Sequence, residues 1–236
     1  MLSKKKSISE LLQSWQYDEE LKQNIIHWHT LDGKRAEYAP FPDELHPSLQ
    51  KALRLRGIEQ LYTHQREAFD KATSGTSFTA ITPTASGKSL CYHLPVLQEI
   101  INDKSSRAIY LFPTKALAQD QKTDLNELIE ATGEEVLSYT YDGDTAPGIR
   151  TKIRKAGHIV MTNPDMLHSG ILPHHTKWVS LFENLKYIVI DELHTYKGVF
   201  GSHVAHVIRR LKRICAFYGA NPIFICTSAT IKNPKE

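Results

Sequence analysis

The stretch TPTASGKSL, residues 82–90, contains residue types that bind phosphate. Gly87, Lys88 and Ser89 match the end of the pattern G-x-x-x-x-G-K-[ST]. In that pattern the lysine reaches the β- and γ-phosphates and the hydroxyl holds Mg²⁺. Thr82 stands at the position of the first glycine. The three matching residues alone are equally compatible with an ordinary turn before a helix, so the interpretation depends on the flanking elements.

Short β-rich apolar segments alternate with helical patterns from Phe78 onward. This alternation is typical of an α/β fold, a parallel β-sheet covered by helices on both faces. The strands are nearly all apolar, as strands buried on both faces must be. In the last helix, Ser202 is the expected N-cap and Gly219 the expected C-terminal stop. We expect strands at residues 78–82, 107–112, 136–140, 158–162, 187–191 and 223–227, and helices at 89–103, 115–132 and 202–219.

The elements on either side of the loop favour a nucleotide site. The loop follows a predicted strand directly and precedes a predicted helix, so backbone N–H groups at the helix start can face phosphates. Pro83 restricts Thr82 to an extended conformation, which allows threonine to replace glycine there. Lys88 is then also a catalytic residue, and Ser89 a Mg²⁺ ligand. The predicted nucleotide-binding residues of the loop are Thr84, Ala85, Ser86, Gly87, Lys88 and Ser89.

A second motif, YIVIDELHTY, places two carboxylates at the end of a buried strand. Asp191 follows four apolar residues, as an acid does in a Walker B strand, and would hold Mg²⁺. Glu192 is the next residue and would orient and deprotonate the attacking water. A strand that ends in a solvated charged turn would look similar, but the phosphate loop upstream favours the catalytic interpretation.

Seven segments, in order from about Leu61 to Thr230, resemble the first RecA-like domain of the superfamily 2 DExH-box helicases. They are YTHQ, TPTASGKS, PTKALAQDQ, TYDGDT, TNPDML, DELH and SAT. The longer segments TNPDMLHSGILPHH and TSATIKNPKE are similar to the bacterial YprA or mitomycin repair factor A (MrfA) branch of DNA helicases. Ala85 stands where many members of the family have glycine, and Ser89 where many have threonine.

The resemblance implies roles for further residues. Gln65 matches a glutamine that reads adenine, and Tyr62 is compatible either with stacking on the base or with a place in the core. His194 would relay between the catalytic loop and the SAT motif. The strand at 223–227 is expected between the phosphate-loop strand and the strand before Asp191. The residues implied to contact nucleic acid or to couple it to hydrolysis are Thr114, Lys115, Gly143, Asp144, Thr162, Asn163, His194, Ser228 and Thr230.

The predicted domain organisation has two parts. Residues 1–56 read as a helical N-terminal extension, with a helix capped by Ser7 or Ser9 and a short helix ended by Gly57. Residues 57–236 read as the first RecA-like domain. The resemblance implies a second RecA-like lobe, which carries the arginine fingers of the family, and a C-terminal domain. We expect both to lie outside this chain.

The composition is typical of a globular protein. Its charge is compatible with a nucleic-acid partner but does not by itself indicate one. The chain has 236 residues, a net charge of +3 and a pI of about 8.6. Its three cysteines are far apart without C-x-x-C spacing, which predicts a reducing compartment and no zinc site. With no apolar segment of membrane length and no secretory signal pattern, we expect a cytoplasmic protein.

The function that these observations favour is an ATP-dependent DNA helicase or translocase, active in DNA repair, with ATP and Mg²⁺ as cofactors. Its partner would be single-stranded DNA, held by sequence-independent backbone contacts. An RNA helicase is one alternative, because the motifs do not separate the two nucleic acids. An ATP-gated nucleic-acid clamp without productive hydrolysis is the other.

Overall fold

The computed structural model describes residues 7–29, 36–83 and 86–229, and the chain divides into two compact units, residues 1–36 and 37–236. The first unit contains α1 (Ile8–Tyr17) and α2 (Glu19–Asn24). Ser7 is the N-cap of α1 and forms a reciprocal capping box with Glu10, which settles the choice between the two predicted caps. Asp18 caps α2, so the single helical pattern becomes two helices.

The second unit includes a helix that the sequence analysis placed in the N-terminal extension. α3 (Pro47–Leu55) packs on α6 (Lys115–Thr132), and both Leu49 and Leu53 are fully buried there. Arg56 adds a bond of 3.1 Å to Asp124 on α6. The predicted boundary between residues 56 and 57 is therefore wrong for α3, because periodicity identifies a helix but not the core that it joins.

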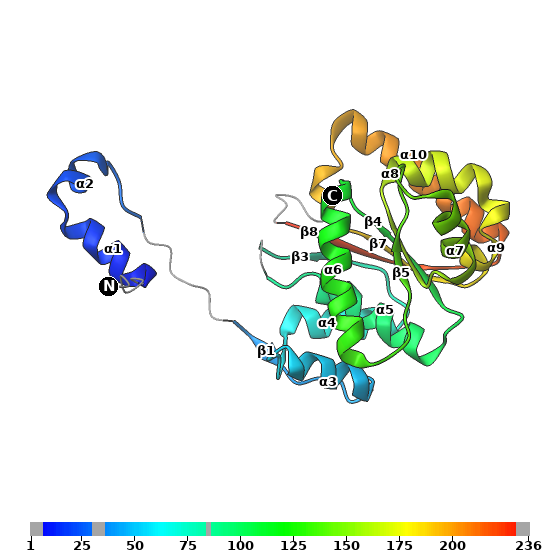
Figure 1. Cartoon of the computed structure of the whole chain (residues 1–236), viewed down its shortest axis with the longest axis horizontal. Helices are drawn as coiled ribbons and strands as arrows, with labels where there is room; N and C mark the ends of the chain where they lie inside the picture. The colour runs from blue at the N-terminus through cyan, green and yellow to red at the C-terminus, as the bar shows by residue number, and fades with distance from the viewer. Residues whose placement is uncertain (1–6, 30–35, 84–85, 230–236) are drawn as a thin grey trace. The chain divides into compact units, whose positions relative to one another are not determined.

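Six parallel strands form the sheet, in the order β3-β8-β7-β4-β6-β5 (Figure 1). This confirms the predicted RecA-like α/β fold, including the expected position of β8 between β3 and β7. The bounds are β3 (Phe78–Ile81), β4 (Arg107–Leu111), β5 (Ser138–Thr140), β6 (Ile159–Thr162), β7 (Leu185–Ile190) and β8 (Ile223–Ser228).

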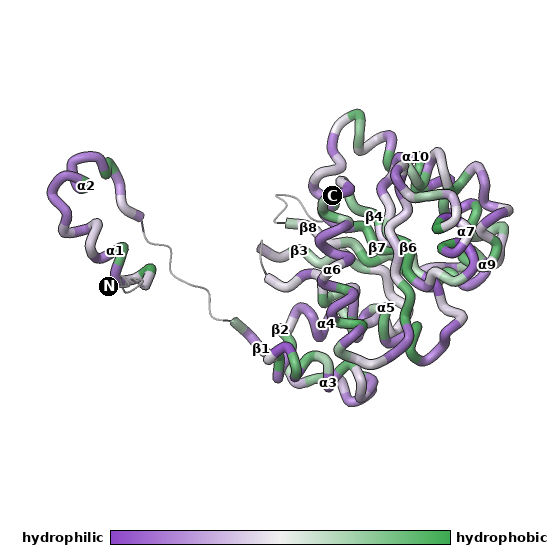
Figure 2. The backbone as a smooth tube through the Cα atoms, viewed as in Figure 1, coloured by the Kyte–Doolittle hydropathy of each residue, from purple (hydrophilic) through white to green (hydrophobic). Residues whose placement is uncertain are grey.

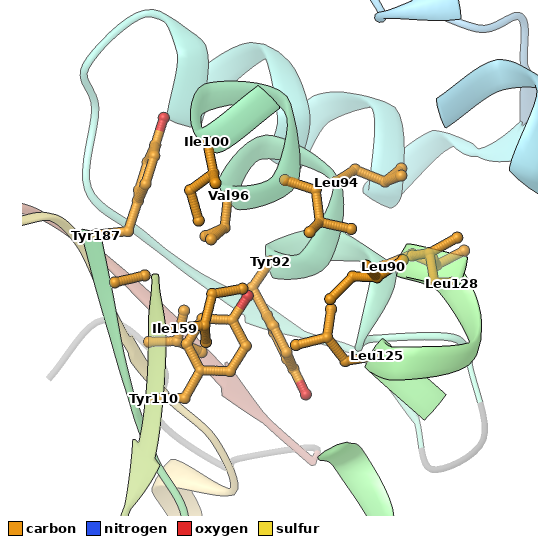
Figure 3. Close-up of a cluster of buried hydrophobic side chains, with 14 of the residues drawn as sticks. Leu90, Tyr92, Leu94, Val96, Ile100, Tyr110, Leu125, Leu128, Ile159 and Tyr187 are labelled. Carbon is orange, nitrogen blue, oxygen red and sulfur yellow. The ribbon is translucent and has the colours of Figure 1, made fainter. Parts of the chain in front are cut away.

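Each face of the sheet carries its own hydrophobic cluster. Along β4, Tyr110 belongs to one cluster and Ile109 to the other, as the two-residue period of a strand requires. Figure 3 shows the first cluster, where side chains of α5 and α6 meet the sheet. The helices that contribute to this first cluster are α3, α4 (Thr63–Thr73), α5 (Leu90–Asn102) and α6. The second cluster, on the other face, includes residues of α7 (Pro147–Ala156), η1 (Leu167–Ile171), η2 (Leu172–Lys177), α9 (Val179–Glu183) and α10 (Gly198–Phe217).

The hydropathy of the chain follows this layering. Hydrophobic colour marks β4 and β7 in the middle of the sheet, and the colour alternates along the covering helices (Figure 2). α10 begins at Gly198, with Lys197 as its N-cap, which is earlier than the predicted start at Ser202. Its predicted end is confirmed, since Gly219 has a φ of +74°. None of the helices in the described ranges combines the length and apolarity needed to span a bilayer.

Some elements have no clear sequence pattern. β1 (Tyr38–Ala39) pairs antiparallel with β2 (Leu61–Tyr62) and makes a second, two-stranded sheet. α8 (Pro164–Met166) and η3 (Leu193–Thr195) are single turns. These pieces are too short for periodicity to reveal, yet β2 and η3 position residues of the site.

Candidate nucleotide and nucleic-acid site

Three predicted motifs meet at the carboxyl edge of the sheet. The phosphate loop follows β3, Asp191 and Glu192 follow β7, and Ser228 ends β8, which lies between the other two strands. Parallel strands present their carboxyl ends on one edge, so the three motifs become neighbours. Thr84, Ala85 and Thr230 lie outside the described residues.

Side chains and backbone close the phosphate loop on itself. The hydroxyls of Thr82 and Ser86 are 2.6 Å apart, a bond that glycine at position 82 would not make. Lys88 Nζ donates to the carbonyl oxygens of Thr82, at 3.1 Å, and Pro83, at 3.0 Å. Gly87 has a φ of +72°, in the left-handed region that favours glycine. Ser89 lies immediately before α5, at the helix start where phosphate oxygens bind.

Gln65 connects the phosphate loop to the start of α4. Its Oε1 accepts the N–H of Tyr62 at 2.9 Å, and its Nε2 donates to the carbonyl oxygen of Gly87 at 2.9 Å. The side chain is 3% exposed. A Cβ on Gly87 would come within 2.6 Å of Gln65 Nε2, so glycine is needed here for space as well as for φ. Gln65 braces the loop; its predicted reading of adenine stays a prediction.

A hollow of about 430 Å³ opens beside Gln65 and the phosphate loop. This is the size of a small-molecule site. The ring of Tyr62 lines it and stacks with those of Tyr38, at 5.2 Å between centroids, and His64, at 5.6 Å. Tyr62 therefore lines a hollow and does not belong to the core. The lining residues are Tyr38, Gly57, Ile58, Glu59, Gln60, Tyr62, Gln65, Gly87 and Leu90.

His64 lies close enough to the phosphate loop to be affected by the charge of Lys88. Its Nε2 lies 3.0 Å from the carbonyl oxygen of Ser86. Burial lowers the pKa of His64 and the positive charge of Lys88 lowers it further, while the bond to Ser86 acts in the opposite direction. Neither His64 nor Tyr38 was predicted from the sequence to belong to the site. Tyr38 could not be, because only the β1–β2 pairing brings it there.

Asp191 is surrounded by donors from β8, from α5 and from its own loop. Its Oδ1 accepts the hydroxyl hydrogen of Thr227 and, at 2.9 Å, the N–H of Glu192. The hydroxyl of Tyr92 on α5 lies 3.4 Å from Oδ2 and 2.8 Å from Oε1 of Gln121 on α6. Burial, followed by the charge of Asp191, raises the pKa of Tyr92 well above its ordinary value. Neither Thr227 nor Tyr92 was predicted to belong to the site: Thr227 directly precedes the SAT residues to which roles were given, and Tyr92 lies three residues beyond Ser89.

Glu192 has an unusual backbone conformation. Its φ is +52°, the only positive φ outside glycine in the described part of the chain. For an L-residue this conformation costs about 1–2 kcal/mol, and such strain clusters at functional sites. It turns the chain sharply after Asp191, directly into η3.

His194 contacts both the catalytic loop and the SAT segment. Its Nδ1 is 3.1 Å from Oε2 of Glu192, 3.4 Å from the hydroxyl of Ser228 and 3.2 Å from the backbone N of Ala229. One ring nitrogen cannot donate to a carboxylate and accept an N–H at once. The bond to Glu192 and the bond to Ala229 are therefore alternatives, and which one forms depends on whether Nδ1 carries a hydrogen. This geometry suits the predicted relay role.

The predicted nucleic-acid segments meet at the ends of β4, β6 and β5. Lys115 Nζ lies 2.6 Å from Oδ2 of Asp144, and both side chains are exposed. Their hydrogen bond raises the pKa of Lys115 and lowers that of Asp144. Gly143 is the neighbour of Asp144, and a Cβ on it would lie 3.9 Å from Lys115 Nζ.

Three other side chains of this region already have backbone partners. Thr114 caps α6 through its hydroxyl, 3.3 Å from the N of Leu117, and Asn163 caps α8 through Oδ1, 2.8 Å from the N of Met166. The hydroxyl of Thr162 is buried and donates to the carbonyl oxygen of Tyr141 at 2.7 Å. In this structure the Thr162 hydroxyl therefore braces the neighbouring loop, and its implied nucleic-acid or coupling role stays a prediction.

This fold and this set of motifs define a helicase motor domain. Residues 62–236 match the DEAD/DEAH box helicase family, and the chain belongs to that family. It is 64% identical over 233 residues to "Uncharacterized ATP-dependent helicase YprA" of Bacillus subtilis, covering 99% of this chain and 31% of that protein. It is 40% identical over 234 residues to ATP-dependent helicase HRQ1 of Saccharomyces cerevisiae, covering 98% of this chain and 21% of that protein.

Solved helicase structures resemble this chain as well. The crystal structure of the DUF1998 helicase MrfA bound to DNA and AMPPNP is 64% identical, with a TM-score of 0.90 over 98% of this chain and 32% of that one. Helicase Lhr of Mycobacterium smegmatis, at 20% identity and a TM-score of 0.71, shares the fold. The predicted superfamily, RecA-like domain and MrfA branch are confirmed. The chain spans about a third or less of the length of these two curated relatives and of MrfA.

Proposed function

We propose that this chain is the ATP-binding first motor lobe of an ATP-dependent DNA helicase or translocase that acts in DNA repair. The observation that supports this best is the convergence of the phosphate loop, Asp191–Glu192 and Ser228 at the ends of three adjacent strands. The hollow beside Tyr62 and Gln65 has room for the base of a nucleotide whose phosphates lie on the loop.

Lys88 and the N-terminus of α5 would bind the phosphates of ATP. Lys88 now donates to two loop carbonyl oxygens, and phosphate oxygens are stronger acceptors because they are charged. The N–H groups at the start of α5 add the favourable field of a helix N-terminus. Gln65 would keep Gly87 in its left-handed conformation while the nucleotide is bound.

Ser89 and Asp191 are a suitable donor pair for Mg²⁺. Both supply hard oxygen atoms, and Oδ2 of Asp191 carries only the longer bond, 3.4 Å from Tyr92. No group of three or more His, Cys, Asp or Glu side chains within the described residues could hold a metal alone. Mg²⁺ fits such a site, because it is usually bound by one or two protein oxygens together with substrate phosphates. When bound, it neutralises charge that develops on the phosphates.

Glu192 would take the proton of the attacking water. The Glu192 carboxylate lies beside His194. The left-handed backbone of Glu192 turns the chain away from the direction of β7. His194 would couple Glu192 to the SAT segment, because its Nδ1 cannot donate to the Glu192 carboxylate and accept the N–H of Ala229 at once, while the Ser228 hydroxyl can follow either state.

The strand would bind across Thr114, Lys115, Gly143, Asp144 and Asn163 through sequence-independent contacts. Lys115 would exchange Asp144 for a backbone phosphate. DNA is favoured over RNA because the MrfA structure at 64% identity was solved with DNA. A second RecA-like lobe would complete the ATP site and the strand track. We also propose a cytoplasmic protein, in keeping with three free cysteines.

An ATPase assay of the longer protein, with single-stranded DNA, RNA and duplex DNA in turn, tests this function. Stimulation by single-stranded DNA above that by RNA is the expected result. Stronger stimulation by RNA would favour the RNA helicase. Strand binding that depends on ATP, without turnover on any nucleic acid, would favour the clamp.

A further inference from the structure

A second hollow, of about 370 Å³, lies between α7 and η2 on the opposite side of the sheet from α5. We call it the α7–η2 pocket. Its walls carry three cations, Arg150, Arg154 and Lys177, together with His174. No carboxylate is among its lining residues, and none of the three cations forms an ion pair within the described ranges. Three uncompensated cations in one concave site create a field that attracts anions.

The two guanidinium groups are held in place by aromatic rings. Arg150 lies over Tyr141, 5.3 Å from the ring centroid, and Arg154 lies over Trp178 at 6.0 Å. Tyr141 and Trp178 are themselves buried and in edge contact, 4.8 Å apart. Because guanidinium groups occupy positions over these rings, the pocket presents cations and not an open stacking platform. This arrangement suits a phosphate better than a base.

Arg154 also carries an unmatched donor. Its Nε is buried and has no hydrogen-bond partner among the described residues. A buried N–H without a partner is costly, so Arg154 is held without compensation for its charge. Because Arg154 lines the pocket, its guanidinium can form a charge-assisted bond to an anionic oxygen there. Lys177 is exposed at the rim, where it can meet a ligand that enters from solvent.

The pocket shares a wall with the proposed strand track. Arg150 donates to the carbonyl oxygens of Asp142, at 3.1 Å, and Gly143, at 3.2 Å. Tyr141, in the floor, is the first residue after β5 and leads directly into that turn. A strand held at Gly143 and Asp144 would therefore lie close to the Arg150 wall of the pocket. Free phosphate would have no such connection to the track.

We propose that the α7–η2 pocket binds a backbone phosphate of the nucleic-acid strand, which extends the track on this lobe beyond the residues that the motifs assign to it. The proposal rests on the proposed function. The pocket would be a sequence-independent contact, with Arg154 and Lys177 as the phosphate ligands and Arg150 connecting them to the turn at Gly143.

The test is the binding of a fluorescent single-stranded oligothymidylate by the 236-residue chain, without nucleotide, across a range of low salt concentrations. Lys177→Ala should weaken binding severalfold and lower the slope of log affinity against log salt by about 0.7, the value for one lost phosphate contact on a single strand. Lys155→Ala is the matched control, because Lys155 is exposed on α7 but does not line the pocket. Arg154→Gln should resemble Lys177→Ala, and circular dichroism checks that each variant is folded.

Equal effects of Lys177→Ala and Lys155→Ala would overturn the proposal, as would no measurable binding by the wild-type chain at low salt. A competition arm with inorganic phosphate separates the sources of the phosphate. If Lys177→Ala changed the affinity for inorganic phosphate but not for the strand, the pocket would be a small-anion site. Lys88→Ala, tested with Mg-ATP alone, addresses the nucleotide site, so failure of one proposal does not mimic failure of the other.

Discussion

Thr227, near the end of β8, donates its hydroxyl hydrogen to Oδ1 of Asp191, which follows β7. The bond joins the proposed magnesium ligand to the strand that continues into Ser228 and Ala229. Both side chains are buried, so the bond is shielded from water and from salt. A shift of β8 relative to β7 would therefore change the position of the Asp191 carboxylate.

Thr227→Val should remove this bond while keeping the shape of the side chain. Asp191 would keep the N–H of Glu192, but its buried carboxylate would lose one donor, at a cost of about 1–3 kcal/mol. We expect a lower free energy of unfolding in urea and weaker Mg-ATP binding by calorimetry. Thr227→Ser keeps the hydroxyl and is the control. If the valine variant matched the wild type in both measurements, Thr227 would not position Asp191.

Lys88→Ala should weaken the affinity of this chain for Mg-ATP by roughly 10- to 100-fold, the effect of losing a charged hydrogen bond. Its two bonds are to loop carbonyl oxygens near the surface, so the free energy of unfolding should change little. Isothermal calorimetry measures the affinity. An unchanged affinity would mean that the loop does not bind phosphate through this lysine.

Glu192→Gln and Asp191→Asn should separate chemistry from binding in the longer protein. Glutamine cannot accept the proton of water, so turnover should stop while ATP and DNA remain bound. Asparagine at 191 weakens Mg²⁺ ligation, so Mg-dependent ATP binding should fall as well. Steady-state ATPase assays and nucleotide titrations with and without Mg²⁺ test the pair. Substantial hydrolysis by the glutamine variant would exclude Glu192 as the general base.

The 236-residue chain by itself should hydrolyse ATP very slowly, with or without DNA, and should not unwind a duplex. One lobe supplies one wall of the ATP site and lacks the expected arginine fingers, whose contribution in related NTPases is roughly 10³–10⁵-fold in rate. A strand-separation assay beside a DNA-stimulated ATPase assay measures both. Robust unwinding by the purified monomer would contradict the two-lobe proposal.

His93 should make the protein less stable in mild acid. Its ring is fully buried, with Nδ1 3.4 Å from the hydroxyl of Tyr110 and Nε2 3.9 Å from Asp124. Burial, aided by the charge of Arg56, lowers the pKa of His93 to about 3. The unfolded chain therefore binds a proton that the folded chain excludes, from about pH 6.5 downward.

Between that pH and about 3, the free energy of unfolding should fall by up to about 1.4 kcal/mol per pH unit from this group. Protonated His93 would gain attraction to Asp124, which reduces the slope. Urea denaturation of the wild type and of His93→Gln at several pH values measures this pH dependence of the free energy of unfolding. A variant with the same pH dependence as the wild type would show that His93 is not the group responsible.

Local sequence determined much of the site. The apolar strands of the main sheet, the loop after β3 and the carboxylates after β7 could all be predicted, because strand burial and phosphate binding each require residue types in a short, fixed order. The position of β8 came from the family resemblance, since nothing in its own residues specifies its neighbours.

Only the tertiary structure decided which side chains share the site. Tyr38, Tyr92 and Thr227 had no predicted role, and they reach the site through β1–β2 pairing, the orientation of α5 and the β7–β8 register. It also assigned α3 to the large unit and paired the hydroxyl of Thr162 with the carbonyl oxygen of Tyr141. Such contacts depend on long-range packing, and a chain specifies that packing only as a whole, whereas periodicity and motif spacing are local.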